Sequence, residues 1–106
     1  MSYPIENIVR LNNLFDLYQN LLTDKQRAYF SYYFREDYSL SEIADIMGVS
    51  RNAVHLQIKK IASYLEDYEI KLQLFKKQEK RQELLEQLKQ HCDSEQEKII
   101  EKIKKV

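Results

Sequence analysis

Glycine and proline are almost absent from this sequence, with one of each in 106 residues. Strands need tight turns, and turns are built mainly from glycine, proline, asparagine and aspartate. Charged residues make up 32% of the chain, and leucine, lysine, glutamate and glutamine are abundant. Because these four residue types favour helices, the sequence predicts an all-α protein.

Cysteine, net charge and long apolar runs are also scarce. Cys92 is the only cysteine, so one chain can form neither a disulfide nor a multi-cysteine zinc site. Lysine plus arginine and aspartate plus glutamate both number 17, whereas a compact nucleic-acid-binding domain usually has a basic excess. No signal-peptide pattern opens the sequence, and no apolar run approaches the roughly 20 residues of a membrane span. We therefore expect a soluble, cytoplasmic protein without a membrane span.

The sequence patterns that are typical of catalytic sites are missing as well. Gly48 is the only glycine, which excludes a glycine-rich phosphate loop. His55 and His91 lie on separate segments without the spacing of a metal pair, and the carboxylates follow no pattern that would gather them into a pocket. We expect no enzyme, no cofactor and no metal site.

The first third of the chain predicts two amphipathic helices. Pro4 suits a first helical turn, and Thr23 with Gln26 forms a capping box that starts a second helix over 24–37. The aromatic residues of this second helix follow helical spacing, which favours core packing over base stacking. The apolar stripe of the first helix consists of Ile5, Ile8, Leu11, Phe15, Tyr18 and Leu22.

The middle of the chain has the features of a helix-turn-helix. Ser39 and Glu42 form a capping box for a short helix over 40–47, which Gly48 ends in the left-handed conformation. Ser50 then caps a second helix. Each feature is weak alone, but together they predict a helix-turn-helix.

From Val54 onward the apolar residues repeat every 3.5 residues over about three heptads. Packing against the preceding helices explains this stripe as far as Leu65. Its continuation must pack against the C-terminal helices, the first helix or a second copy of the chain. We predict a homodimer interface at Tyr68, Leu72 and Phe75.

The last third is dominated by charge, with narrow apolar stripes typical of an antiparallel hairpin or a coiled coil. Ser94 and Glu97 suggest a capping box, and we expect helices over about 77–92 and 95–105. The predicted organisation is a helix-turn-helix domain over 1–72 followed by a C-terminal helical extension over 73–106.

The helix that begins at Ser50 has an outward face suited to binding a macromolecule. With Val54 at the centre of the buried side, about 100° per residue turns Asn52, Leu56 and Lys59 outward. In a DNA-reading helix such positions contact bases, arginine pairing with guanine and asparagine with adenine. A phosphate can also bind at the helix N-terminus. The candidate binding residues are Ser50, Arg51, Asn52, His55, Leu56, Lys59 and Lys60.

Acidic residues around this motif weigh against nucleic acid. Carboxylates repel a phosphate backbone, and Leu56 fits a thymine methyl group and a protein surface equally well. The residues alone leave nucleic acid and protein open as the ligand. The acidic residues concerned are Glu36, Asp37, Glu42, Asp45, Glu66, Asp67 and Glu69.

The stretch from "LLTDKQRAYF" to "IASYLEDYE" resembles region 4 of bacterial sigma factors. More closely, the chain resembles the YlxM family of bacterial helix-turn-helix proteins. The segments that carry this resemblance are "NLFDLYQNLLTDKQRAYFSYYFREDYSLSEIA", "GVSRNAV" and "LEDYEIKLQLF", within residues 5–76.

The resemblance implies that the gene neighbours those of the signal recognition particle GTPase and its receptor. Family members are thought to be accessory or regulatory factors of that protein-targeting pathway. Our leading hypothesis is such a factor, whose helix from Ser50 binds the particle's GTPase or RNA. The alternatives are a transcriptional regulator binding duplex DNA through the same helix, and a protein-interaction module using the heptad stripe.

Overall fold

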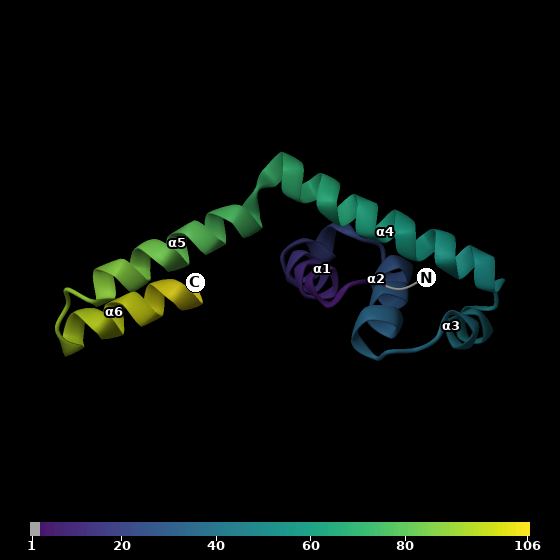
Figure 1. Ribbon diagram of the computed structural model, residues 1–106, viewed down its shortest axis with the longest axis horizontal. Helices are drawn as coiled ribbons and strands as arrows, with labels where there is room; N and C mark the ends of the chain where they lie inside the picture. Colours follow the sequence, from purple (N-terminus) through teal and green to yellow (C-terminus); the bar gives the residue numbers. More distant parts are fainter. Residues whose placement is uncertain (1–2) are drawn as a thin grey trace. The chain divides into compact units, whose positions relative to one another are not determined.

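The computed structural model describes residues 3–106, in which there are six α-helices and no strand. The prediction of an all-α protein is confirmed. None of the helices in this range has the length and apolar character needed to cross a membrane. Figure 1 shows the helices, which are α1 (Ile5–Tyr18), α2 (Asp24–Phe30), α3 (Leu40–Met47), α4 (Arg51–Leu72), α5 (Leu74–Lys89) and α6 (Ser94–Lys105).

The chain divides into two compact units, Met1–Leu72 and Gln73–Val106. Between them Gln73 has a φ of 55°, a left-handed conformation that ends α4 and that residues other than glycine seldom adopt. Phe75, the last residue of the predicted apolar stripe, therefore belongs to α5 and not to α4. The apolar spacing continues across Gln73, but the helix does not.

In the N-terminal unit, α4 packs against α1, α2 and α3 (Figure 1). The rings of Phe15 and Phe30 stack in this core, with centroids 4.2 Å apart. The predicted buried side of α4 is confirmed, since its four central apolar residues are 0% exposed. These residues are Val54, Ile58, Ile61 and Leu65.

Helix α1 buries less of its stripe than we predicted. Leu11, Phe15 and Tyr18 are buried, but Ile5 in the first turn is 79% exposed. Apolar spacing identifies the face of a helix, but it does not show how far the neighbouring helices extend to cover that face.

The second helix begins as predicted and ends earlier. The Thr23 hydroxyl accepts a hydrogen bond from the Gln26 N–H at 3.1 Å, and the Gln26 side chain accepts one from the Thr23 N–H at 2.9 Å. After Phe30, residues Ser31–Arg35 form a π-helix, in which the Glu36 N–H donates to the Ser31 carbonyl at 2.9 Å. The expected regular helix over 24–37 thus contains a wider turn.

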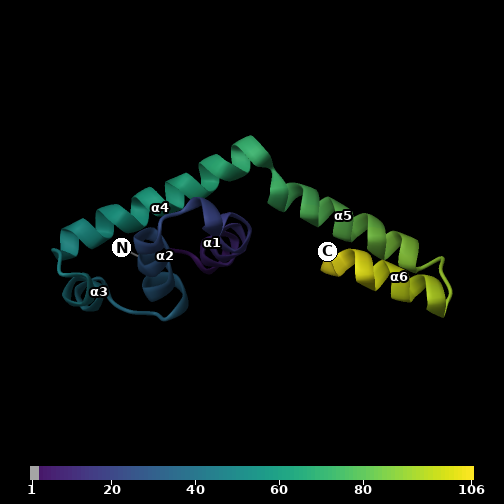
Figure 2. The same ribbon diagram turned by 180° about the vertical axis from the view of Figure 1, so that it is seen from behind.

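In the C-terminal unit, α5 and α6 form an antiparallel hairpin (Figure 2). Its N-cap prediction was wrong by one residue: Asp93, not Ser94, caps α6 and accepts a hydrogen bond from the Gln96 N–H at 2.9 Å. Two capping patterns overlap in this sequence. The aspartate carboxylate forms the charge-assisted bond, and Ser94 becomes the first helical residue.

Candidate functional site

The turn between α3 and α4 is set by three local features. Ser39 and Glu42 make both bonds of the predicted capping box, at 3.0 and 3.1 Å. Gly48 ends α3 with a φ of 68°, and no heavy atom beyond Gly48 and its two chain neighbours lies within 4 Å of where its Cβ would be. The left-handed backbone, rather than lack of space, therefore favours glycine. These features confirm the predicted start and end of α3.

Ser50 fixes the first turn of α4. Its hydroxyl oxygen accepts a hydrogen bond from the Ala53 N–H at 3.0 Å, and its carbonyl accepts one from the Val54 N–H at 3.1 Å. The predicted N-cap is confirmed. The cap holds the next two residues, Arg51 and Asn52, on the exposed first turn.

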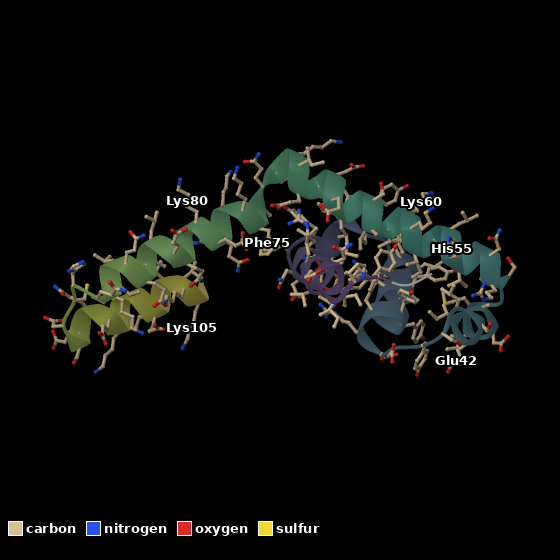
Figure 3. All side chains as sticks on the ribbon, in the orientation of Figure 1. Glu42, His55, Lys60, Phe75, Lys80 and Lys105 are labelled. Carbon is tan, nitrogen blue, oxygen red and sulfur yellow. The ribbon has the colours of Figure 1, made fainter. Side chains whose placement is uncertain are left out.

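The predicted binding residues are accessible. His55 is half-buried and Leu56 is 57% exposed. Figure 3 shows Lys60 projecting from α4 on the side away from the other helices of its unit. The role of this face in binding stays a prediction. The exposed candidates, besides Leu56, are Ser50, Arg51, Asn52, Lys59 and Lys60.

The arginines of the N-terminal unit differ in their ion pairing. Arg10, Arg27 and Arg35 each form an ion pair with a carboxylate. Within residues 3–106, by contrast, Arg51 and Lys59 have no ion-pair partner. Two positive side chains of α4 are thus available to an external anion.

Besides Glu42 in its capping box, two more of the acidic residues near the motif have internal partners. Arg10 donates two hydrogen bonds to Glu66, at 2.8 and 2.9 Å. Glu69 is 7% exposed and accepts a hydrogen bond from the Tyr18 hydroxyl at 2.7 Å. The positive charge of Arg10 offsets the negative charge of Glu66, which lessens the repulsion of a phosphate backbone that we inferred from composition.

Glu69 is also a buried residue that the sequence analysis missed. The sequence analysis placed Tyr68 in a predicted dimer interface and Glu69 among the acidic residues around the motif. In the structure Tyr68 is half-buried and Glu69 is buried. The four-residue step from Leu65 matches a helix of 3.6 residues per turn, and this spacing was the available signal. The charge of Glu69 kept it off the list of predicted core residues, because carboxylates are seldom buried without a partner.

The three residues of the predicted dimer interface do not share one helix. The Tyr68 hydroxyl donates a hydrogen bond to the Leu21 carbonyl at 3.4 Å, so its position is partly explained within the unit. Leu72 is 46% exposed at the end of α4, and Phe75 is half-buried near the start of α5. A dimer through these residues stays a prediction.

No group of three metal-binding side chains occurs within the described residues 3–106. The chemistry available on the α4 face is therefore that of cations, an amide, an imidazole and backbone N–H groups at a helix N-terminus. Such groups bind anions and hydrogen-bonding partners.

Comparison with known proteins agrees with the helix-turn-helix geometry. Residues 5–106 match the family described as "Putative helix-turn-helix protein, YlxM / p13 like". A UPF0122 protein of Halalkalibacterium halodurans is 50% identical over 86% of this chain and 84% of its own length. UPF0122 proteins of Bacillus thuringiensis and Bacillus mycoides are each 45% identical, over 96% of this chain and 98% of theirs. The chain thus belongs to the UPF0122 family of YlxM-like helix-turn-helix proteins, which confirms the resemblance found in its motifs.

Proposed function

We propose that the exposed face of α4 binds nucleic acid, and that the chain acts by binding rather than by catalysis. Its target would be the RNA of the signal recognition particle, to which it serves as an accessory or regulatory factor. The observation that carries this proposal is Arg51, which has no ion-pair partner among residues 3–106 and lies beside Asn52 on the capped and exposed first turn of α4.

The geometry of α4 suits a polyanion. Backbone N–H groups at a helix N-terminus carry partial positive charge, and Arg51 adds a full charge there. Lys59 lies eight residues further on, or about 12 Å along the helix. The two cations can therefore contact phosphates that are separated along a nucleic-acid strand, with Asn52 and His55 available to bases between them.

Two considerations favour the RNA of the particle as the target. The YlxM-family resemblance links the chain to the signal recognition particle pathway. A formal net charge of zero suits a factor that recognises an assembled particle more than a stand-alone DNA regulator, which depends on salt-sensitive phosphate contacts. With three cations on the face, the logarithm of affinity should fall with the logarithm of salt at a slope of about −2 for single-stranded RNA.

A transcriptional regulator that binds duplex DNA is the second candidate. Arg51 and Asn52 occupy the first turn of the second helix, where helix-turn-helix proteins contact base edges in the major groove. Arg51 would pair with guanine and Asn52 with adenine. Three phosphate contacts to duplex DNA predict a salt slope of about −3.

The test measures binding of the full chain to particle RNA and to duplex DNA of matched length at low salt, by fluorescence anisotropy. The double variant Arg51→Ala, Lys59→Ala should weaken RNA binding at least about tenfold and flatten the salt slope. The matched control is Lys25→Ala, Lys71→Ala, which removes two exposed lysines outside the face and should change affinity less than about twofold.

The results separate the candidates. Tighter binding to particle RNA than to duplex DNA supports the pathway role, and the reverse supports a transcriptional regulator. No binding to either nucleic acid would overturn both. If the chain instead binds the purified particle GTPase without RNA, and Leu56→Ala weakens that complex, the face recognises protein.

A further inference from the structure

The α5–α6 hairpin is too small to be stabilised by a hydrophobic core of its own. It spans residues 73–106, and units below about 40 residues usually need a disulfide, a metal or association with another chain. Cys92 is the only cysteine, and no metal-binding group occurs within the described residues. Of the apolar residues described in this unit, Leu85 and Ile100 are buried. Association is the remaining means of stabilisation.

One side of the hairpin is apolar and open. Leu84, Leu88 and Ile99 are 54%, 51% and 58% exposed. A groove of about 410 Å³ lies between the two helices on this side. Its apolar lining consists of Leu88, Cys92, Ile99, Ile100 and Ile103, and none of its lining residues is a lysine, arginine, aspartate or glutamate. We call this surface the apolar face.

A different side of the hairpin is closed by ion pairs. Lys89 pairs with Glu101 at 3.1 Å, and Lys104 pairs with Glu86. At 3.6 residues per turn, Glu86 lies about 160° around α5 from Leu88. The hairpin therefore has two ion pairs between its helices on one side and leaves its aliphatic side chains uncovered on the other.

Charge is distributed unevenly along the hairpin. At the open end, formed by residues 76–83 and 102–106, seven lysines and arginines stand against two carboxylates. Figure 3 shows Lys80 projecting there from α5, away from α6. At the turn end, residues 90–97 contain three carboxylates and no lysine or arginine. The hairpin is thus positive at its open end and negative at its turn end.

We propose that the apolar face is covered by the same face of a second copy of this chain, with the two hairpins antiparallel in a four-helix bundle. A two-fold axis places the same surface of both copies in contact. In the antiparallel arrangement, the negative turn end of each copy lies against the positive open end of the other. A parallel arrangement would bring like charges together, and a partner without this polarity would lack the match.

This dimer differs from the interface predicted from the heptad stripe. Its contacts lie within α5 and α6, and they do not include Tyr68, Leu72 or Phe75. It also does not depend on what the α4 face binds, so the two proposals can fail separately.

The first test is the molar mass of the full chain, measured by light scattering over a wide concentration range. Wild type should be a dimer, and Leu88→Glu with Ile99→Glu should be a monomer at the same concentrations. Gln90→Glu is the matched control, because it adds a carboxylate at the exposed C-cap of α5, outside the groove lining, and it should remain a dimer. A wild-type monomer at all concentrations would overturn the proposal. A monomer would mean that the face packs against the chain's own N-terminal unit or an unrelated partner.

The second test exchanges charges and does not disturb the apolar face. Lys80→Glu with Arg81→Glu should weaken the dimer about tenfold, and so should Glu95→Lys with Glu97→Lys, because several rim pairs become repulsive. All four substitutions in one chain should restore dimerisation to within about threefold of wild type. If Lys80→Glu with Arg81→Glu strengthens the dimer, the hairpins are parallel and the proposal fails. Circular dichroism verifies that every variant keeps its helix content.

Discussion

The two units of this chain are both helical, but they are stabilised in different ways. The N-terminal unit has an aromatic and aliphatic core in which Leu14, Phe30 and Ile43 are 0% exposed, and it contains all eight tyrosines. The C-terminal hairpin lacks tyrosine, and most of its aliphatic side chains are on its surface. The difference teaches that helical periodicity alone does not distinguish a helix with its own core from one that needs a partner.

The largest expected effect is loss of a core side chain in the N-terminal unit. Ile58 is 0% exposed, so Ile58→Ala should lower the free energy of unfolding by about 2–5 kcal/mol. Ile99 in the hairpin is 58% exposed, and Ile99→Ala should cost less than about 1 kcal/mol in a dilute, monomeric sample. Urea denaturation of both variants measures the contrast. Equal losses would mean that the hairpin is as well packed as the N-terminal unit.

The next effect concerns the buried carboxylate of the N-terminal unit. Tyr18→Phe removes the hydroxyl that donates to Glu69 at 2.7 Å and should destabilise the unit by about 1.5–3 kcal/mol. Tyr68→Phe removes a longer, exposed hydrogen bond of 3.4 Å and should cost less than about 0.5 kcal/mol. Thermal unfolding followed by circular dichroism compares them. If Tyr18→Phe leaves the stability unchanged, the hydrogen bond between Tyr18 and Glu69 has no stabilising role.

Helix caps allow the same change to be made in both units. Ser39→Ala and Asp93→Ala each remove an N-cap side chain and should each cost about 1 kcal/mol. The Ser39 loss should appear in unfolding of the whole N-terminal unit, because α3 packs into its core. The Asp93 loss should appear as faster amide hydrogen exchange in α6, with little change in the N-terminal unit. If amide hydrogen exchange is faster throughout the chain in both variants, the two units unfold together.

The smallest effect is a pH dependence confined to the N-terminal unit. Burial raises the pKa of Tyr3 above its ordinary value of 10.0, and the nearby Tyr33 adds to this. Burial also raises the pKa of Tyr33, with a further contribution from Asp37. The folded state therefore favours the neutral phenols. Their contribution to stability is complete below about pH 10 and is lost as the pH rises through the folded-state pKa values.

Phenolate absorbance during an alkaline titration measures this effect. Asp37→Asn should lower the pKa of Tyr33, and asparagine tolerates the left-handed backbone at this position, where φ is 57°. The hairpin has no tyrosine, so it contributes no phenolate absorbance to this titration. A phenolate titration unchanged in Asp37→Asn would contradict the assigned cause.

Much of the candidate site could be predicted because it depends on local interactions. Ser39, Gly48 and Ser50 act on residues within four positions of themselves, so their residue types alone predicted the turn and the start of α4. The predictions were less accurate where the local sequence is compatible with two different structures. Asp93 and Ser94 both offered caps, and the break at Gln73 interrupts an apolar spacing that would also have suited a longer helix.

By itself, the sequence determined the all-helical fold, the helix-turn-helix and the buried side of α4, because spacing and capping operate within a few turns of one helix. Only the tertiary structure decided that Glu69 is buried against Tyr18, that Arg10 binds Glu66 and that Arg51 has no ion-pair partner among the described residues. The contacts of Glu69 and Glu66 join residues more than 50 positions apart in the chain. Which distant side chains meet depends on how the helices pack, and a helical period carries no information about that packing.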